Sequence, residues 1–400
     1  EIPLEEGLAY RHKENVHRDF YRERLLPRRY STMGPGMAAG DLDGDGADEI
    51  WIGGAVELPG TIFDGRAYNG KPIEQPALVA DGDFEDQGAI FFDADGDGDL
   101  DLYVVSGGND NVADSALFQD RLYRNDGTGR LTRDTNALPT IRSSGSAVAA
   151  ADFDGDGDLD LVVGGRVVPD FYPDPPRSLL LRNDGGQFVD ATASLAPALE
   201  RHGMISSLIF SDVDNDNDPD IVAVGEWLAP TIFENDGGRF APLASTGLEA
   251  YTGWWNSVVG GDFDEDGDPD LYVCNDFSPD AFLRNDTSRG SFEPKFTDVT
   301  AEMTDGKMGF GMGASVGDYN ADGNLDLYVS NMYSKAGNRI VAQLDGIDEQ
   351  IKVSAHGNFL YENQGDEFRQ VAGLEDDDQQ ISVVGWSFGG QFADFDNDGD

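Results

Sequence analysis

The chain has 400 residues, of which 39% are hydrophobic and 10% aromatic, which is enough for a large core and argues against a disordered acidic tail. Its formal net charge is −50, from 77 acidic and 27 basic residues. This charge argues against nucleic acid or an anionic membrane surface as partner and favours cations. No stretch approaches the roughly 18 apolar residues of a membrane helix, so we expect no transmembrane segment. The chain begins at Glu1 without a charged-then-apolar leader, as expected of a processed, secreted product.

Residues 1–30 form the first predicted region. The stretch "YRHKENVHRDFYRERLLPRR", residues 10–29, holds seven of the 27 basic residues. We expect this N-terminal segment to cover the acidic rim of the repeats that follow, or to lend them an outer strand that closes a ring, because repeated sheets must protect their edges. A docking strip for an acidic partner is the alternative.

One acidic motif recurs seven times in the second predicted region, residues 31–400. The copies, called here the first to seventh acidic loops, begin at residues 41, 93, 152, 212, 262, 318 and 394, as in "DFDGDGDLD" from residue 152. Their spacing of 50 to 76 residues fits one propeller blade or one solenoid unit.

The flanks of the acidic loops decide between these two architectures. A strand of small residues such as "SAVAAA" precedes each loop, and a continuously apolar strand such as "LYVVSG", typical of burial on both faces, follows it. Most units then carry a hairpin signature such as "LYRNDGTGRLT". Four short antiparallel strands per unit predict an all-β fold, a seven-bladed β-propeller with an acidic loop between the first and second strands of each blade. The sequence ends at Asp400 inside the seventh loop, so we expect an incomplete seventh blade, and residues 335–355 could hold one helix.

The carboxylates of each acidic loop repel one another unless a cation neutralises them. The spacing D-x-D-x-D-G matches the first half of a calcium loop, with oxygen ligands at positions 1, 3 and 5, a turn at 6 and a carbonyl at 7. Here position 9 supplies the last carboxylate and a strand follows, so the motif is not a helix–loop–helix. Oxygen ligands without His or Cys favour Ca²⁺ over zinc or copper.

We therefore predict up to seven Ca²⁺ ions, and the sixth loop, with Asn at positions 3 and 7, should bind most weakly. The predicted metal ligands, loop by loop, are Asp41, Asp43, Asp45 and Glu49; Asp93, Asp95, Asp97 and Asp101; Asp152, Asp154, Asp156 and Asp160; Asp212, Asp214, Asp216 and Asp220; Asp262, Asp264, Asp266 and Asp270; Asp318, Asn320, Asp322 and Asp326; and Asp394, Asp396 and Asp398.

The repeated loops resemble the FG-GAP/VCBS repeat family, whose calcium-loop blades also form the heads of integrin α-subunits. Stretches such as "WWNSVVGGDFDEDGD" and "MGASVGDYNADGNLDLYVSNMYSKAGNRI" resemble bacterial secreted relatives of cartilage acidic protein, which usually carry a C-terminal ASPIC/UnbV module. The resemblance covers residues 30–400. It implies an extracellular or cell-surface protein for adhesion and ligand binding, with calcium in a structural part, and it fixes no ligand.

The face opposite the acidic loops should collect the long, irregular connections, where binding usually resides. Positions just past the second strands should ring the central channel there, and aromatic residues on nearby loops can stack on sugars or anchor a protein. The predicted ligand-binding residues are Arg166, Tyr172, Glu226, Asn275, Asp276 and Asn331.

No motif in the sequence requires catalysis. "GASVG", residues 313–317, fits G-x-S-x-G, but that motif needs a strand–turn–helix and here runs from a strand into an acidic loop. We therefore expect an extracellular calcium-binding propeller that binds a protein or glycan on the cell surface or in the matrix. Two alternatives stay open: a carbohydrate-active enzyme, lyase or hydrolase, using the face opposite the acidic loops, and a structural subunit of a surface layer or filament.

Overall fold

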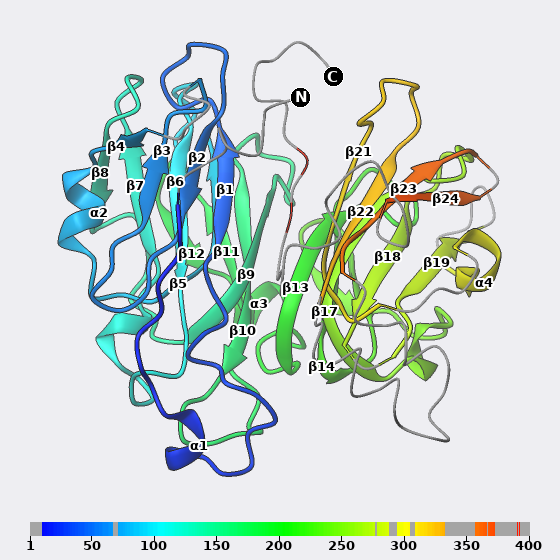
Figure 1. Ribbon diagram of the computed structural model, residues 1–400, viewed down its shortest axis with the longest axis horizontal. Helices are drawn as coiled ribbons and strands as arrows, with labels where there is room; N and C mark the ends of the chain where they lie inside the picture. Colours follow the sequence, from blue (N-terminus) through cyan, green and yellow to red (C-terminus); the bar gives the residue numbers. More distant parts are fainter. Residues whose placement is uncertain are drawn as a thin grey trace. The chain divides into compact units, whose positions relative to one another are not determined.

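The computed structural model describes residues 10–66, 71–276, 278–287, 294–304, 309–332, 357–365, 367–372, 390 and 392. Strands and turns dominate these residues (Figure 1), which confirms the all-β class. The seventh acidic loop and the helix expected at 335–355 lie outside the described residues. The chain divides into two compact units: the first comprises 1–205, 236–241 and 393–399, and the second comprises 206–235, 242–392 and Asp400.

Six four-stranded antiparallel meanders make up the described strands, three of them within residues 37–190. These three contain β1 (Met37–Gly40), β2 (Glu49–Ile52), β3 (Thr61–Phe63) and β4 (Pro72–Ile73); β5 (Asp86–Phe92), β6 (Asp101–Ser106), β7 (Arg121–Asn125) and β8 (Leu131–Asp134); and β9 (Ser144–Ala151), β10 (Asp160–Val167), β11 (Leu179–Asn183) and β12 (Phe188–Asp190).

The other three meanders repeat the same order from residue 204 onward. They contain β13 (Met204–Ser211), β14 (Asp220–Leu228), β15 (Thr231–Asn235) and β16 (Phe240–Pro242); β17 (Gly253–Gly261), β18 (Asp270–Asn275), β19 (Ala281–Asn285) and β20 (Phe296–Asp298); and β21 (Gly311–Gly317), β22 (Asp326–Asn331), β23 (Phe359–Asn363) and β24 (Phe368–Ala372). Strands β14 and β17 also pair, so that two meanders share one sheet.

Helices are few and short in the described residues. They are α1 (Asp19–Arg22), α2 (Pro76–Ala80), α3 (Thr192–Leu195) and α4 (Thr300–Met303), with the 3-10 turns η1 (Ala116–Phe118) and η2 (Leu248–Ala250). Among the residues that the structure describes, none of these helices has the length and apolar character needed to cross a bilayer.

The connections follow the predicted pattern. Each of the first six acidic loops joins the first strand of a meander to the second, and the Asn-Asp-Gly turns join the third to the fourth. The second strands β6, β10 and β18 are buried along their whole length, which confirms the expectation from their apolar sequence.

The small residues of the first strands make room for the next repeat. A Cβ placed on Gly40 would lie 2.8 Å from Leu100 Cδ1, and one on Gly261 would lie 2.9 Å from Leu325 Cδ1. Both leucines occupy position 8 of the following acidic loop. The loop of one meander therefore packs against the first strand of the meander before it.

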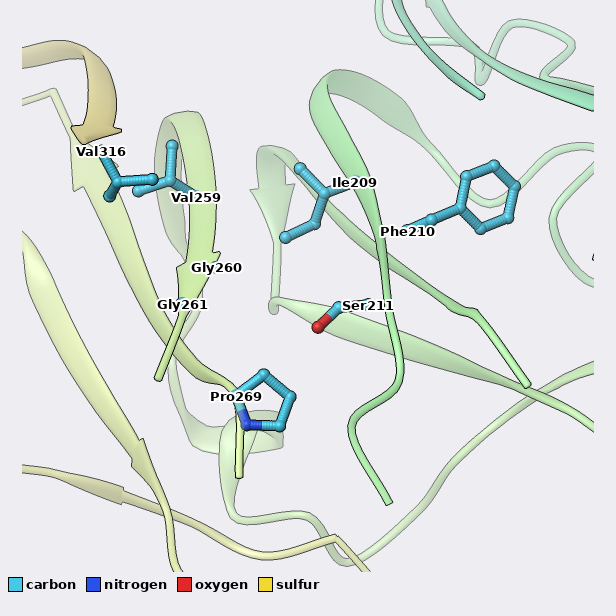
Figure 2. A pocket seen from close by; sticks show the side chains of 8 residues that line it. All are labelled: Ile209, Phe210, Ser211, Val259, Gly260, Gly261, Pro269 and Val316. Carbon is cyan, nitrogen blue, oxygen red and sulfur yellow. The ribbon is translucent and has the colours of Figure 1, made fainter. Parts of the chain in front are cut away.

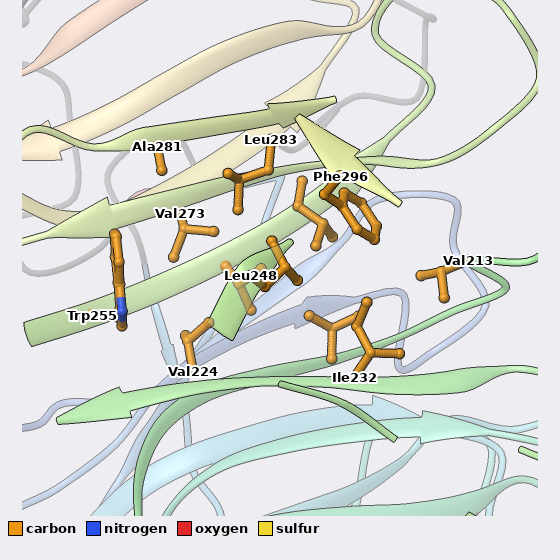
Figure 3. Packing of buried hydrophobic residues seen from close by; sticks show 12 residues of the cluster. Val213, Val224, Ile232, Leu248, Trp255, Val273, Ala281, Leu283 and Phe296 are labelled. Atoms are coloured by element: carbon orange, nitrogen blue, oxygen red, sulfur yellow. The ribbon is translucent and has the colours of Figure 1, made fainter. Parts of the chain in front are cut away.

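The core consists of layers between neighbouring meanders. In the second unit, Val224 and Ile232 of one meander pack with Val273, Leu283 and the other residues of a twelve-residue cluster (Figure 3). Trp255 belongs to this cluster and is 4% exposed, so it packs in the core. Burial of such apolar side chains is the main stabilising contribution to each meander pair.

The N-terminal segment is described from Tyr10, and it contains α1 and no strand up to residue 30. The buried carboxylate of Asp19 accepts hydrogen bonds from the backbone N–H groups of Tyr30 and Ser31 and from Asn109 Nδ2, all at 3.2 Å. Tyr30 packs on Val167 at the end of β10. The segment is thus fixed to connections of the first unit, while its role in closing a ring stays a prediction.

Candidate metal centres

Five of the six described acidic loops bring three carboxylates together, with one oxygen from each lying within 4.8 Å of the others. The described residues hold no other such group, and the sixth loop does not form one. The five groups are Asp41, Asp43 and Asp45; Asp93, Asp95 and Asp97; Asp152, Asp154 and Asp160; Asp212, Asp214 and Asp216; and Asp262, Asp264 and Asp266.

The aspartate at position 1 holds the backbone turn of each loop. In the third loop, Asp152 Oδ1 accepts from the N–H groups of Gly155 at 2.8 Å and Asp156 at 3.1 Å, and Oδ2 accepts from Gly157 at 3.0 Å. The aspartate at position 5 in turn accepts from the N–H at position 7, as Asp156 does from Asp158 at 3.0 Å. These bonds orient carboxylates toward the centre of the loop.

Positions 4 and 6 of the loops have left-handed backbones. Gly155 has φ 75° and Gly157 has φ 99°, whereas the fifth and sixth loops place Glu265 at 58° and Ala321 at 55° in position 4. Glycine adopts this region without strain, so its frequency at both positions is a backbone requirement. The turn at position 6 was predicted from the calcium-loop spacing, whereas the left-handed residue at position 4 was not predicted.

The carboxylate at position 9 joins the loop to the third strand of its meander. Asp270 Oδ2 accepts from Phe263 N–H at 3.2 Å, and Oδ1 accepts from Asn285 N–H at 2.8 Å. Asp160 and Asp220 repeat both bonds in their own loops. Position 9 is thus a structural link as well as a predicted ligand.

The asparagine that ends the third strand connects successive repeats, a role that the sequence analysis missed. Asn183 Nδ2 donates to Leu159 O at 3.1 Å in its own loop and to Ala94 O at 3.0 Å in the preceding loop. Asn125 and Asn285 make the same pair of bonds. The signal was available in the sequence, because an asparagine precedes every turn of the hairpin signature.

Burial and crowding raise carboxyl pKa values in the loops. Burial raises the pKa of Asp160, Asp220 and Asp270 to about 7, with neighbouring loop aspartates adding to the rise. Burial, together with Asp216 and Asp212, raises the pKa of Asp214 to about 6. A cation would remove this repulsion and favour the ionised carboxylates.

The residue types in the loops fit a hard divalent cation. In the fourth and fifth loops, Asp214 Oδ1 and Asp264 Oδ1 are buried with no hydrogen-bond partner, and both belong to the three-carboxylate groups. These carboxylate groups contain neither histidine nor cysteine. All-oxygen donor sets of this kind suit Ca²⁺.

In two loops, an arginine side chain of the same chain lies next to the carboxylates. In the second loop, Arg124 Nη1 lies 2.6 Å from Asp101 and 3.4 Å from Asp95. In the first loop, Arg66 Nη1 lies 2.8 Å from Asp45. An arginine next to a carboxylate competes with a metal ion for the same charge.

The predicted ligand-binding residues lie outside the acidic loops and are mostly buried. Arg166 is 2% exposed and lies over the Tyr30 ring, with 5.2 Å from its guanidinium carbon to the ring centroid. Tyr172 is half-buried and tilts against Tyr30. Asn275 N–H donates to Asp280 at 2.7 Å, and Glu226 pairs through its backbone with Trp254. Their role in ligand binding is still a prediction.

The other two predicted ligand-binding residues are also held by the protein itself. Asp276 is 7% exposed, and its N–H donates to Trp254 O at 3.0 Å. Asn331 is fully buried, and its N–H donates to Asn358 Oδ1 at 2.9 Å.

One cavity of about 380 Å³ lies within the second unit (Figure 2). Its lining residues are Ile209, Phe210, Ser211, Val259, Gly260, Gly261, Pro269 and Val316. None of these lining residues carries a carboxylate, imidazole, amine or thiol side chain.

Comparison with known protein families finds the FG-GAP-like repeat at residues 93–163, 212–273 and 262–329. Each match begins at position 1 of an acidic loop and ends in the second strand of the next meander. The curated proteins give no match.

The similar solved structures include the following three, all at low identity. The biofilm matrix protein Bap1 of V. cholerae has a TM-score of 0.35 and 18% identity, over 66% of this chain and 38% of that one. The major allergen Mala s 1 of Malassezia sympodialis has a TM-score of 0.42 and 9% identity, over 76% and 87%. The extracellular domain of the hybrid two component system BT4673 of B. thetaiotaomicron has a TM-score of 0.42 and 13% identity, over 89% and 37%.

The chain therefore spans well under half the length of the Bap1 and BT4673 chains. At these TM-scores the similarity supports no conclusion about function. The repeat matches and the recurring acidic loops agree with each other in position: this chain contains FG-GAP-like repeats at three positions.

Proposed function

We propose that the chain is a calcium-binding β-propeller of seven repeats that serves outside the cell as an adhesion, ligand-binding or scaffold module. The observation that carries this proposal is the recurrence of a three-carboxylate group in five loops, each at the same place in a four-stranded meander. The group uses positions 1, 3 and 5 in four of these loops and positions 1, 3 and 9 in the third loop. Repetition in register with the strands indicates a shared structural purpose, which isolated acidic turns would not have.

Calcium would act in this protein as part of the fold. The ion neutralises carboxylates at positions 1, 3 and 5, and the position 9 carboxylate fixes the loop to the third strand. The asparagine after that strand bonds to its own loop and to the loop before it, as Asn285 does with Pro269 and Val213. Ordering one loop therefore supports its neighbour.

The proposed place of action is outside the cell. Seven calcium ions would reduce the net charge from −50 to −36, which still favours a soluble surface. Extracellular calcium is abundant enough to fill sites of modest affinity, for which extracellular modules are typical.

The proposed binding surface is the end of the meanders away from the acidic loops. Phe171 is 55% exposed and precedes the half-buried Tyr172 in the connection after β10. An exposed aromatic ring such as that of Phe171 can stack on a sugar or anchor a protein side chain. The buried residues at this end would support such a surface instead of contacting the ligand.

Calcium titration of metal-free protein tests the proposal. We expect several ions per chain by equilibrium dialysis, and a thermal midpoint that chelation lowers on the order of 10 °C and calcium restores. Magnesium at equal concentration is the control, because it requires stricter octahedral geometry and should stabilise less. A midpoint unchanged by chelation, with no calcium retained, would refute calcium as a structural ion here.

A further inference from the structure

The outer surface of the N-terminal segment differs in composition from the rest of the chain. Ten of its residues between 10 and 29 are exposed, and all ten are basic or largely apolar. They are Arg11, Lys13, Val16, Arg18, Phe20, Tyr21, Arg24, Leu25, Pro27 and Arg29. In a chain with a net charge of −50, this stretch therefore presents five exposed basic residues and no exposed acidic residue.

The three acidic residues of this stretch face the protein. Asp19 is fully buried, and Glu14 is half-buried with its Oε2 enclosed. Glu23 Oε1 accepts from Tyr172 N–H and Glu23 Oε2 accepts from Asn109 Nδ2, both at 3.1 Å. These carboxylates hold the segment on the first unit and leave its basic and apolar side chains outside.

Arg22 fastens α1 to two connections of the first unit. Its Nε donates to Asp170 Oδ1 at 3.0 Å in the connection after β10, and its Nη1 donates to Asn109 O at 3.3 Å in the connection after β6. Close in sequence to these contacts, Phe171 and Val112 are also exposed. Exposed apolar side chains from all three segments therefore lie at the same end of the first unit.

Val16, Tyr21 and Leu25 protrude from this end. Their exposed fractions are 93%, 82% and 83%. Exposed apolar side chains that gather in one place are typical of an interaction surface. A sugar ring stacks on a flat aromatic face, which the aliphatic Val16 and Leu25 do not offer. A lipid interface receives aliphatic side chains of any shape, and Lys and Arg beside them suit anionic headgroups.

The acidic loops of the first unit lie away from this end. Figure 1 shows α1 at the end of the sheets opposite the β1–β2 turn, which holds the first acidic loop. Strand β10 leads from the third acidic loop to the connection that Arg22 contacts, and its eight residues span roughly 26 Å. Charges in physiological salt are screened over about 8 Å. The net charge, which argues against an anionic membrane for the chain as a whole, therefore does not describe this end.

Exposed acidic residues are few in the two connections that Arg22 contacts. They are Asp114, Asp170 and Asp174, and Asp170 is paired with Arg22. The five exposed basic residues of the segment thus outnumber the other two aspartates. The local charge favours an anionic partner.

We propose that this surface binds an anionic lipid bilayer, with Val16, Phe20, Tyr21 and Leu25 inserted among the headgroups. The exposed arginines and the lysine of the segment would contact the anionic lipids. Burial of the four side chains and the attraction of each cation both favour binding. This partner differs from the protein or sugar ligand proposed above, and no calcium ion takes part in the contact.

Flotation with lipid vesicles tests the proposal. In saturating calcium, we expect the native chain to bind vesicles of phosphatidylcholine with one third phosphatidylglycerol, and to bind pure phosphatidylcholine about tenfold more weakly or less. Val16→Ser combined with Leu25→Ser should lower the affinity for the anionic vesicles about tenfold or more. Arg18→Glu combined with Arg24→Glu should lower it to a similar extent.

The matched controls carry the same changes elsewhere in the first unit. Val79→Ser, at a side chain 62% exposed in α2, and Arg130→Glu, at an exposed residue between β7 and β8, should leave the vesicle affinity unchanged. Thermal midpoints in calcium check that every variant folds. Calcium that bridges the acidic loops to lipid would not depend on the segment. No vesicle binding, or equal affinity in the native chain and both combined variants, would therefore overturn the proposal.

A fluorophore on the segment reports insertion. The lone Cys274 is fully buried, so a reagent for exposed thiols should label Leu25→Cys alone. We expect its emission to shift to the blue with anionic vesicles and to stay unchanged with soluble polyglutamate, whereas a label on Val79→Cys should respond to neither. Tight binding of polyglutamate without a response to vesicles would overturn the bilayer and indicate an acidic protein as partner. The calcium proposal is tested by dialysis and chelation, so failure here would leave it standing.

Discussion

The fifth and sixth acidic loops share one backbone and differ in charge. Asp262 accepts from the N–H groups at positions 5 and 6 at 3.1 Å each, and Asp318 does so at 3.0 and 2.8 Å. Asp270 and Asp326 accept from position 2 at 3.2 Å and from the third-strand asparagine at 2.8 Å. Of these two loops, only the fifth brings three carboxylates together.

This difference separates two functions within the motif. Positions 1 and 9 form the hydrogen bonds that shape the loop, and they are aspartate in both. Position 3 is Asp264 in the fifth loop and Asn320 in the sixth, without a change in those hydrogen bonds. The carboxylate at position 3 is therefore dispensable for the loop's shape, and its charge is available for an ion.

The substitution Asp270→Ala should have the largest effect. It leaves the buried N–H groups of Phe263 and Asn285 without acceptors, so we expect the free energy of unfolding of metal-free protein to fall by about 3 kcal/mol. Asp264→Asn is the matched control and should change the free energy of unfolding by less than about 0.5 kcal/mol. Urea unfolding in chelator measures both, and equal losses would contradict the division of functions.

The stability of the metal-free chain should fall as pH rises from 4 to 7. The pKa values of Asp160, Asp220 and Asp270 are about 7 in the folded chain, well above the ordinary value of 3.8. The folded state then binds more protons than the unfolded state between pH 4 and 7, and stability should fall as pH rises through this window.

Calcium should remove or reverse this trend, because it binds the ionised carboxylates. Thermal midpoints measured from pH 4 to 8, with chelator and with calcium, test the expectation. A metal-free midpoint that rises steadily from pH 4 to 7 would show that these carboxylates are ionised in the folded chain.

A carboxylate at position 3 should bring the calcium affinity of the sixth loop closer to that of the fifth. We expect Asn320→Asp to raise its calcium affinity about tenfold, or about 1.4 kcal/mol, because one more carboxylate joins the donor set. The amide signal of Gly323 at position 6, in glycine-labelled protein, follows this loop alone. Asp264→Asn should lower the calcium affinity of the fifth loop, which the amide signal of Gly267 follows. Unaltered calcium affinity in both variants would argue against position 3 as a ligand.

The smallest effect concerns the backbone at position 4. Ala321 has φ 55°, so Ala321→Gly should relieve left-handed strain and stabilise the protein by about 1 kcal/mol, with or without calcium. Gly323→Ala at φ 94° should destabilise it by at least as much. Chemical unfolding measures both changes, and stabilisation that appears only with calcium would indicate an effect on the ion instead.

The sequence determined the repeated unit. The period-2 strands, the buried apolar second strands and the Asn-Asp-Gly turns depend on neighbours in the chain, so local patterns predicted the four-stranded meanders and the place of the acidic loops. The same holds for the carboxylates at positions 1, 3 and 5, which the spacing alone places on one turn.

Only the tertiary structure determined how repeats are joined and where the N-terminal segment lies. Asn183 bonds to Ala94 across 89 residues, and Asn109 bonds to Asp19 across 90, and neither distance leaves a pattern within a sequence window. The burial of Arg166, Glu226 and Asn331 likewise depends on what packs over them.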